Sequence, residues 1–434
     1  MTEGGGVLER DVPSIWQKLT KPAAIFPSFS GRAEVDVAIV GGGVSGLSIA
    51  YHLAREGGRP MVLEAARCGA GALGASAGII APQLVRTTPR AVLARLGQET
   101  GSRLLRLVAE SGNYTFDLVR THGLECGASQ AGFLAPARTA AAVRHVSELF
   151  REWQPFRRDL ELVDARAVSQ LSGCRGYECG LLDNTGGGLN PLAYARELAR
   201  LAAMAGASIH EDSRVIALRQ AAHGWSIRTE AGEVSAARVM LCANGSNPWL
   251  HPALKRTVIP LPVYEVATGA LGADVRSTIL PAQHVLTDVE ADVLSLRWAD
   301  DNRLITAYPA AAGADHQALE AAVNRRLAAV LQLRAAQRLE FAWHGVAWIN
   351  QGLLPRLVGV TDSLVAVQAC NGRGIAVNTI LGREVARWLV SPGSYRPEVP
   401  VEAPRNFRWF GVARHVPRFV LAAAMARRRL TRSR

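Results

Sequence analysis

A short apolar run leads straight into a glycine-rich turn in the stretch Val35-Asp36-Val37-Ala38-Ile39-Val40-Gly41-Gly42-Gly43-Val44-Ser45-Gly46. The run Val35–Val40 has the length and composition of a buried strand, and a helical pattern follows it to about Arg55. A second apolar run, Met61–Leu63, ends at Glu64. Together these segments predict the opening of a parallel βαβ unit.

The glycines of this turn are spaced as G-x-G-x-x-G at Gly41, Gly43 and Gly46. In such a turn they allow a tight bend, close approach of a pyrophosphate, and packing of helix on strand. Val44 and Ser45 begin the helix, whose free N–H groups and positive end favour phosphate. Glu64 ends the second strand, where a carboxylate accepts hydrogen bonds from ribose hydroxyls and repels a 2′-phosphate. These features predict a binding site for a dinucleotide, either NAD or FAD. The alternative is a glycine-rich turn with a surface glutamate.

Composition limits the remaining classes of function. The 434 residues are 49% hydrophobic, which excludes a disordered chain and suggests two or three folding units. The net charge is +12, but nine arginines and no acidic residue lie between Arg405 and Arg434, so the rest carries only about +3. That distribution argues against a nucleic-acid-binding protein.

Six scattered cysteines and unclustered histidines predict neither a disulfide framework nor a metal site. The first ten residues lack the pattern of a secretory signal, and no run reaches the ~18 apolar residues of a membrane span. We therefore expect a soluble, cytoplasmic protein. The basic tail mixes apolar and basic residues, so peripheral binding to a membrane surface is a less favoured alternative.

The order of patterns predicts an α/β architecture combined with a second, strand-rich unit. A helical pattern covers about 86–170, a helix starts at Asn190-Pro191, strands dominate Lys255–Pro309 and Leu339–Ile349, and a last helix runs over Gly374–Leu389. We expect a discontinuous Rossmann-like FAD-binding domain and an inserted mixed-sheet substrate domain capped by helices. The expected boundaries are 1–34 for an extended lead-in; 35–85, 165–254 and 350–400 for the nucleotide domain; 86–164 for a helical segment; 255–349 for the substrate domain; and 401–434 for the basic tail.

Several further segments carry a resemblance to a known family. They are Ser14-Ile15-Trp16, Gly74-Ala75-Ser76-Ala77-Gly78-Ile79-Ile80-Ala81-Pro82-Gln83, Gly188-Leu189-Asn190-Pro191, Leu241-Cys242-Ala243-Asn244-Gly245 and Asn371-Gly372-Arg373-Gly374-Ile375-Ala376. With the first turn, these segments resemble FAD-dependent oxidoreductases of the D-amino-acid-oxidase type. The nearest branch contains the glycine, sarcosine and γ-glutamylputrescine oxidase-like enzymes.

The resemblance implies FAD, bound without a covalent link, and a set of cofactor-binding residues beyond the first turn. That set is Glu64, Arg67, Ala75, Ser76, Val215, Ala243, Gly245, Gly372, Arg373, Gly374 and Ile375. Gly372 and Gly374 open a helix whose N–H groups could stabilise negative charge near flavin N1 and O2. Alternatively, that loop serves only as a turn, and Arg373 either assists the flavin or faces solvent.

The implied reaction is oxidation of the C–N bond of a primary or secondary amine or amino acid by hydride transfer to flavin N5, giving an imine that hydrolyses. Oxygen or another acceptor would then take the electrons. Tyr264, Arg297, His344 and Arg373 are the candidate catalytic residues, and Arg297 could bind a substrate carboxylate bidentately. The alternatives are a surface arginine and a core histidine. Arg356 is a further, weaker candidate beside the site.

Three other functions remain open on sequence alone. The first is a membrane-associated flavin dehydrogenase that passes electrons to a quinone or partner protein. The second is a non-catalytic subunit that holds FAD for assembly. The third, a nicotinamide-dependent dehydrogenase, would give a colourless protein.

Overall fold

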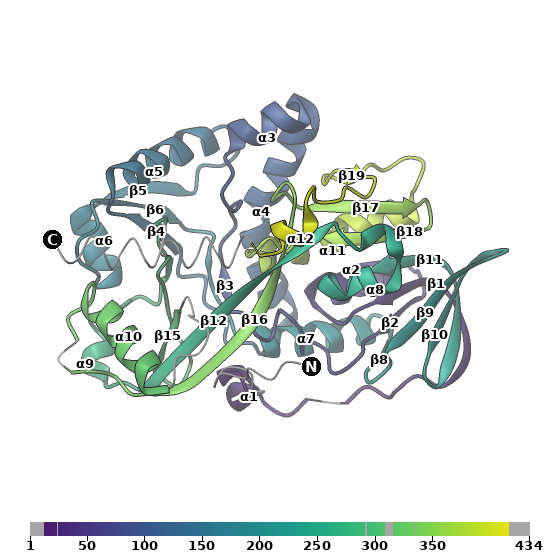
Figure 1. Ribbon diagram of the computed structural model, residues 1–434, viewed down its shortest axis with the longest axis horizontal. Helices are drawn as coiled ribbons and strands as arrows, with labels where there is room; N and C mark the ends of the chain where they lie inside the picture. The colour runs from purple at the N-terminus through teal and green to yellow at the C-terminus, as the bar shows by residue number, and fades with distance from the viewer. Residues whose placement is uncertain (1–12, 24, 291–292, 309–315, 334, 416–434) are drawn as a thin grey trace.

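The computed structural model describes residues 13–23, 25–290, 293–308, 316–333 and 335–415. Two sheets, each with its own helices, form two halves that lie side by side (Figure 1). This confirms the expected combination of a Rossmann-like unit with a mixed-sheet unit. Residues 416–434, most of the basic tail, lie outside the described residues.

The first sheet is parallel at its centre and contains the strand that opens the nucleotide motif. Its path runs β19-β17-β18-β11-β1-β2-β8, and β9 and β10 extend it beside β11 as an antiparallel hairpin. The strands are β1 (Gly31–Val40), β2 (Pro60–Leu63), β8 (Ser208–His210), β9 (Val215–Ala221), β10 (Gly224–Thr229), β11 (Gly232–Leu241), β17 (Arg356–Thr361), β18 (Leu364–Gln368) and β19 (Val401–Glu402). The strands β18, β11, β1, β2 and β8 are mutually parallel, as βα crossovers require.

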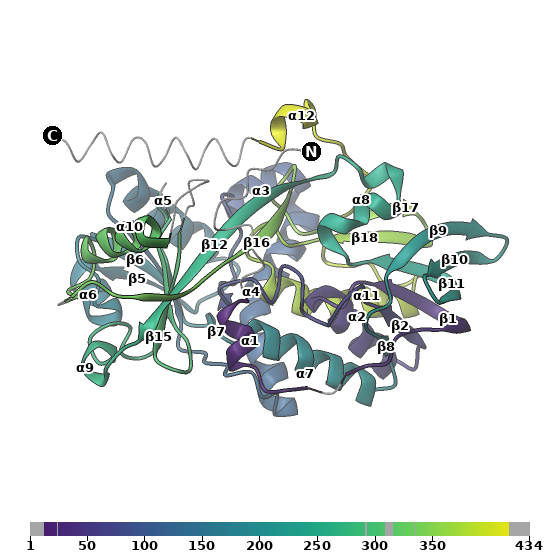
Figure 2. The same ribbon diagram turned by 60° about the horizontal axis from the view of Figure 1, so that its bottom comes forward.

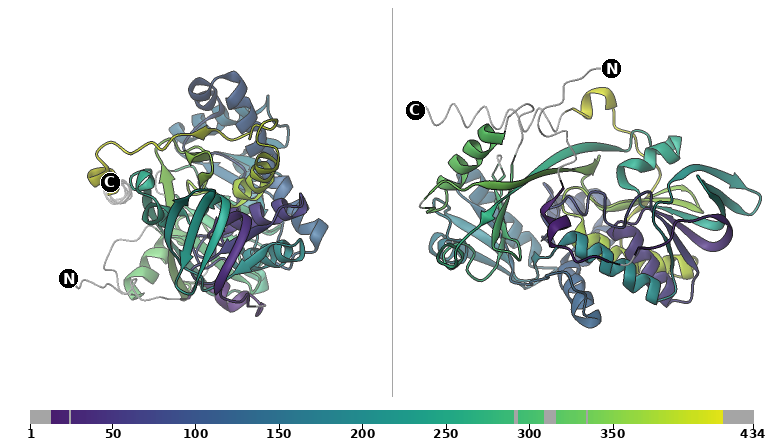
Figure 3. Two further views of the ribbon diagram at one scale, coloured as in Figure 1. Left: turned by 90° about the vertical axis from the view of Figure 1, so that its right-hand side faces the viewer. Right: turned by 90° about the horizontal axis from the view of Figure 1, so that it is seen from below.

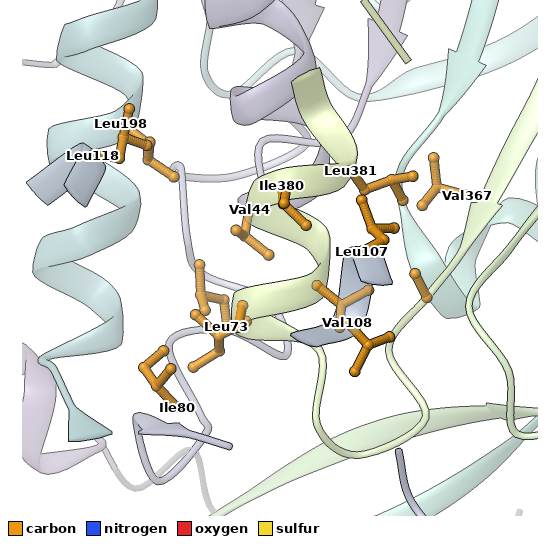
Figure 4. Close-up of a cluster of buried hydrophobic side chains, with 14 of the residues drawn as sticks. Val44, Leu73, Ile80, Leu107, Val108, Leu118, Leu198, Val367, Ile380 and Leu381 are labelled. Atoms are coloured by element: carbon orange, nitrogen blue, oxygen red, sulfur yellow. The ribbon is translucent and has the colours of Figure 1, made fainter. Parts of the chain in front are cut away.

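Four long helices share the largest hydrophobic core with this sheet. They are α2 (Val44–Arg55), α4 (Gln98–His122), α7 (Pro191–Met204) and α11 (Ile375–Val390). Figure 4 shows part of this core, where Val44, Leu107, Ile380 and Leu381 lie together. The helix α7 begins where expected, because the Asn190 side chain accepts the N–H groups of Leu192 and Ala193.

The second sheet has the path β16-β12-β15-β14-β13-β4-β6-β5. Its strands are β4 (Phe133–Ala137), β5 (Leu160–Asp164), β6 (Cys179–Asp183), β12 (Val258–Ala270), β13 (Val285–Thr287), β14 (Ser295–Trp298), β15 (Arg303–Ala307) and β16 (Leu339–Asn350). Only the β13–β4 pair is parallel, so the sheet is mixed, as expected. The helices α5 (Ala140–Trp153), α6 (Ala165–Ser172) and α10 (His316–Ala328) pack in this half (Figure 2).

The long antiparallel pair β12–β16 runs from one half to the other (Figure 1). Its register extends from Val258 opposite Asn350 to Thr268 opposite Leu339. This pair therefore brings side chains of the second sheet to the nucleotide-binding half. The remaining short elements are α1 (Ile15–Leu19), β3 (Ile79–Ile80), α3 (Pro89–Leu96), β7 (Gly187–Gly188), η1 (Asn244–Ser246), α8 (Asn247–Leu250), η2 (Pro252–Leu254), α9 (Ala273–Arg276) and α12 (Phe410–Ala413).

Three segments differ from the sequence-based expectation. The span 86–164 contains the strands β4 and β5, and β6 joins them in the second sheet although 165–254 was expected in the nucleotide half. Strands of only five residues are hard to separate from helical periodicity. The lead-in 1–34 contains the helix α1 and the first four residues of β1, and α1 is too short to show a helical period.

Candidate active site

The first glycine turn leaves no room for side chains at two of its three motif positions. A Cβ on Gly41, whose φ is +113°, would lie 2.8 Å from the carbonyl carbon of Cys242. A Cβ on Gly46 would lie 2.1 Å from the carbonyl oxygen of Gly41. A Cβ on Gly43 would have no atom within 4 Å, so this glycine borders open space at the start of α2.

The late glycine loop lies directly beside this early turn. The Ser45 hydroxyl in the first turn of α2 donates to Asn378 Oδ1 in α11 over 2.7 Å, across 333 residues of sequence. Asn378 Nδ2 in turn donates to the carbonyls of Ala369, at 3.1 Å, and Gly374, at 2.7 Å. One side chain thus joins the start of α2 to the loop that precedes α11.

Both helices begin without a side-chain cap. Gly43 precedes α2 and Gly374 precedes α11, and in neither case does a side chain of the cap residue accept a hydrogen bond from the helix N–H groups. The first N–H groups of a helix need acceptors, and its positive end favours negative charge. Gly372, with φ +89°, also borders open space. Two adjacent helix starts are therefore available to one electron-rich ligand.

The carboxylate of Glu64 lies at the end of β2, next to the first turn. It accepts the N–H groups of Gly42 at 2.6 Å and Ala66 at 3.0 Å, and a carboxylate has further acceptor capacity. Val215 begins β9 near this strand end, since Ser213 N–H donates to the Glu64 carbonyl. Arg67, which the sequence predicts at the cofactor, forms an ion pair of 2.8 Å with buried Glu211.

The turn after β11 is connected to the late loop through β16. A Cβ on Gly245 would lie 1.8 Å from the Trp348 ring, so this indole packs directly on the turn that contains Ala243. The Trp348 carbonyl accepts the N–H of Asn371 at 3.2 Å, and the Asn371 amide oxygen accepts the N–H of Asn350 at 3.0 Å. The Asn371 Nδ2 atom is buried without a partner, which leaves a donor for a ligand in this loop.

The loop of residues 74–78 lies against the strand β16. A Cβ on Gly345 of β16 would lie 2.8 Å from the Ala75 methyl group, so strand and loop touch. The Ser76 hydroxyl donates to the Leu73 carbonyl at 2.8 Å and accepts the N–H of Gly78 at 3.3 Å, which holds the loop in shape. Ala75 and Ser76 therefore meet the strand pair that crosses between the halves.

Arg297 lies on β14 as expected but has a different role from a carboxylate-binding group. Its Nη1 donates to the carbonyls of Ala77, Gly78 and Leu189 at 3.0, 2.8 and 2.7 Å. Its guanidinium also lies 5.0 Å from the ring centroid of Trp16. Burial lowers the pKa of Arg297 to about 10, and the carboxylates of Asp300 and Glu265 oppose that shift. Arg297 is a buried structural cation.

Arg373 points into the molecule rather than away from it. Its guanidinium stacks over Phe133 of β4 at 5.2 Å and makes one long hydrogen bond, 3.5 Å, to Gln83 Oε1. The nearby carboxylate of Asp183 is already bound by both Nη atoms of Arg157. Burial lowers the pKa of Arg373 to about 10, with Asp183 opposing the shift. Arg373 thus makes one long hydrogen bond, although a guanidinium has five N–H donors.

Tyr264 and His344 face each other across the β12–β16 pair, with ring centroids 5.9 Å apart. Tyr264 is half-buried and His344 is exposed. His344 lines a small cavity together with Ser14, Gln17, Gly74, Ala75 and Trp343. Arg356, the further candidate, is buried, and its side chain donates hydrogen bonds to Gln368 and Glu402.

Sequence reasoning missed three residues that hold these parts together: Asn378, Trp348 and Gln83 as a partner of Arg373. An asparagine facing inward from a helix start is the signal that could have found Asn378. Its side chain competes with the backbone and therefore belongs where loop carbonyls lack partners. No sequence signal distinguishes Trp348 from an ordinary strand residue.

Comparison with known proteins gives matches over most of the chain. The model of the DAO family, described as FAD dependent oxidoreductase, matches residues 36–388. The gamma-glutamylputrescine oxidoreductase of Escherichia coli K12 is 26% identical over 372 residues, covering 84% of this chain and 86% of that protein. The glycine oxidase of Geobacillus kaustophilus is 28% identical over 243 residues, covering 53% and 59%.

Solved structures agree in fold. A glycine oxidase from Bacillus cereus superposes with a TM-score of 0.66 at 18% identity, over 83% of this chain and 96% of that one. An L-amino acid deaminase from Proteus vulgaris superposes with a TM-score of 0.70 at 15% identity, over 89% and 96%.

Proposed function

The chain belongs to the FAD-dependent oxidoreductase family, and on that premise we propose that it oxidises the C–N bond of an amine that carries a carboxylate. The cofactor is FAD. The relatives named above act, by name, on γ-glutamylputrescine and glycine, which supports an amine or amino acid as the substrate class. The single observation that favours an acidic substrate is the half-buried guanidinium of Arg373, which has only one long hydrogen bond.

The geometry of the described residues is compatible with bound FAD. Gly43 and Gly372 border open space, α2 and α11 start side by side without caps, and Asn371 Nδ2 is a buried donor without a partner. The start of α2 would hold the pyrophosphate, Glu64 the ribose, and the start of α11 the electron-rich edge of the ring. When bound, FAD supplies the two-electron acceptor for the oxidation of a C–N bond.

The chain's own contribution is to bind and orient the amine and to exclude water. Arg373 presents a planar fork of donors that matches a carboxylate, and its stacking on Phe133 fixes the plane of that fork. A carboxylate bound there would replace the single long bond to Gln83 by two charge-assisted bonds. Tyr264 and His344 lie on the strands that touch the loop 74–78, and we propose that they contact the rest of the substrate.

Because the amine must give up a hydride, it reacts in its neutral form, and the released proton passes to water or to a neighbouring group. The site offers no cluster of His, Cys, Asp or Glu that could hold a metal within the part of the chain that the structure describes. We propose that Arg373, Tyr264 and His344 act by placement and charge. Within the same residues, no helix is both long enough and apolar enough to cross a bilayer.

An anaerobic titration tests the proposal. The purified protein should be yellow, and its visible band should bleach when an amino acid or another carboxylate-bearing amine from a panel is added without oxygen. A failure to bleach across the whole panel would contradict the proposed reaction. Bleaching by nicotinamide cofactor alone would contradict the substrate class.

The Arg373→Gln variant separates the role of Arg373 from general damage to the site. We expect KM for a carboxylate-bearing amine to rise by about 10- to 100-fold, because one charge-assisted interaction contributes about 1.5–3 kcal/mol. The corresponding amide or ester, which has no carboxylate, should react equally well with both enzymes. Equal losses for both kinds of substrate would contradict an anion-binding role.

A further inference from the structure

Five consecutive backbone carbonyls, from Gly74 to Gly78, all accept hydrogen bonds from side chains. Ser14 Oγ donates to Gly74 at 3.1 Å, Trp343 Nε1 to Ala75 at 3.0 Å, and Trp16 Nε1 to Ser76 at 2.8 Å. Arg297 Nη1 donates to Ala77 and Gly78. Most side-chain hydrogen bonds in proteins are scattered, so an unbroken series on one loop is a specific arrangement.

The donors come from three distant parts of the chain and also contact one another. Ser14 and Trp16 belong to the segment of α1, Arg297 to β14 and Trp343 to β16. The Trp16 and Trp343 rings meet edge to face at a centroid distance of 6.5 Å, and the Arg297 guanidinium covers the Trp16 ring at 5.0 Å. Trp16 is fully buried, so this is an internal structure. In Figure 3, α1 lies beside α7, where the two halves of the molecule meet.

Fixing a carbonyl also fixes the N–H group of the next residue. In a trans peptide the C=O and the following N–H point in opposite directions. The Gly74 and Ser76 carbonyls point at Ser14 and Trp16, so the N–H groups of Ala75 and Ala77 point away from α1.

These two N–H groups differ from their neighbours. Gly74 N–H donates to the Gly69 carbonyl, Ser76 N–H to the Leu73 carbonyl and Gly78 N–H to the Ser76 hydroxyl. The N–H groups of Ala75 and Ala77 donate to no atom of the described residues. Both residues are partly exposed, so these two N–H groups are open to an acceptor from outside the chain, such as a ligand.

We propose that Ser14 and Trp16 are positioning residues for the flavin: they set the two peptide planes whose free N–H groups bind acceptor atoms of the ring. Trp343 and Arg297 complete this clamp, which comprises Ser14, Trp16, Arg297 and Trp343. The inference rests on the proposed function for the identity of the ligand. The segment before β1 is thus part of the cofactor site, although it lies outside both sheets.

The Trp16→Phe variant tests this role because it removes the indole N–H and keeps an aromatic ring against Trp343 and Arg297. We expect the dissociation constant for FAD to rise by roughly fivefold, the effect of about 1 kcal/mol for one hydrogen bond. Loss of oriented donors should also shift the midpoint potential of the bound flavin to more negative values. Ser14→Ala should produce the same two changes through the neighbouring peptide.

Trp225→Phe is the matched control. Trp225 is a buried tryptophan of β10 whose Nε1 donates to the Ser363 hydroxyl at 3.0 Å, far from residues 74–78 in the fold. We expect Trp225→Phe to lower thermal stability without changing the FAD affinity or the midpoint potential. Wild-type affinity and potential in Trp16→Phe would overturn the inference, as would equal changes in the Trp16 and Trp225 variants.

The clamp and the proposed reaction fail in different ways. A protein that binds FAD but is bleached by no amine refutes the reaction, while affinity and potential still report on the clamp. A protein that is bleached normally and shows no change in Trp16→Phe refutes the clamp alone.

Discussion

At the scale of single residues, the three motif glycines have three different physical requirements. Gly41 has a left-handed φ, and a Cβ built on it would lie 2.8 Å from a backbone atom. A Cβ built on Gly46 would lie 2.1 Å from a carbonyl oxygen. Gly43 has neither restriction. The structure therefore separates glycines needed for folding from one available to a ligand.

Substitution by alanine should show this separation. Gly46→Ala should lower the free energy of unfolding of the FAD-free protein, because overpacking typically costs about 1–3 kcal/mol. Gly43→Ala should leave that stability near the wild-type value while weakening FAD binding, since its methyl group would enter the ligand's space. Denaturant unfolding and FAD titration measure the two effects; a Gly43→Ala protein that unfolds like Gly46→Ala would contradict the assignment.

His52 provides a test of pH dependence. It is half-buried and shares a 2.8 Å hydrogen bond with the Tyr114 hydroxyl. Its pKa is lowered to about 3 by desolvation and by the charges of Arg383, Arg55 and Arg387. In the unfolded chain its pKa is about 6.5, so the unfolded state binds a proton first as the pH falls. The stabilisation by neutral His52 is complete above pH 6.5 and is lost progressively toward pH 3.

We therefore expect the wild-type protein to lose more stability between pH 6.5 and 5 than His52→Gln. The difference approaches about 1.4 kcal/mol per pH unit at the lower end. His223→Gln, at an exposed hairpin turn, serves as the control and should retain the wild-type slope. Parallel pH profiles for wild type and His52→Gln in chemical denaturation would count against the burial of a neutral imidazole.

The sequence predicted the glycine turn well because its residues are set by local sterics. It could not predict the partner of Arg297, because three carbonyls from two other segments converge on that guanidinium only in the folded chain. Arg373 is similar: its direction depends on Phe133 in the second sheet. Local motifs thus predict the glycine turn, while the directions of Arg297 and Arg373 depend on tertiary contacts.

At the scale of elements, the close packing of α2 against α11 aligns the two helix starts. The Ser48 hydroxyl donates to the Thr379 carbonyl at 2.6 Å, and a Cβ on Gly382 would lie 2.1 Å from Ser48 Oγ. The two helix backbones approach closely only because residue 382 has no side chain. This packing supports the contact between Ser45 and Asn378 one turn away.

Gly382→Ala should force α2 and α11 apart. We expect a loss of about 1–3 kcal/mol in stability and a weaker affinity for FAD, because both helix starts move. Gly393→Ala, whose Cβ would have no atom within 4 Å, should change neither quantity. Calorimetry of both FAD-free proteins measures the stability; identical melting temperatures would contradict the proposed close packing.

The elements α2, α11 and β16 were predicted close to their observed bounds, and α7 was predicted from its start. Each has a long amphipathic pattern or a clear start, such as Asn190-Pro191 before α7. The short elements α1, β4 and β5 were not predicted, because five residues do not define a period and their conformation depends on tertiary packing. Thus the sequence does not reveal that α1 contributes to the cofactor site.

At the scale of the whole molecule, the site is assembled from both halves. The nucleotide half provides the starts of α2 and α11, and the strands β12, β14 and β16 bring Tyr264, Arg297 and His344 from the other sheet. A ligand that touches both halves should stabilise the native state as a unit.

FAD at 100 times its dissociation constant should therefore add about 2.7 kcal/mol to the free energy of unfolding. We expect one cooperative melting transition that moves to higher temperature with FAD concentration. Circular dichroism of FAD-free and FAD-loaded protein measures this. A transition in which only one half is stabilised would show that FAD touches that half alone.

The central claim is that the early and late glycine turns bind the same FAD molecule. Hydrogen–deuterium exchange of the FAD-free protein, measured during titration with FAD, tests this claim most directly. The account predicts that the amides of residues 43–46 and 374–378 become protected together, with one concentration dependence and one FAD per chain. Protection of only one of these segments, or protection of the two at different FAD concentrations, would contradict it.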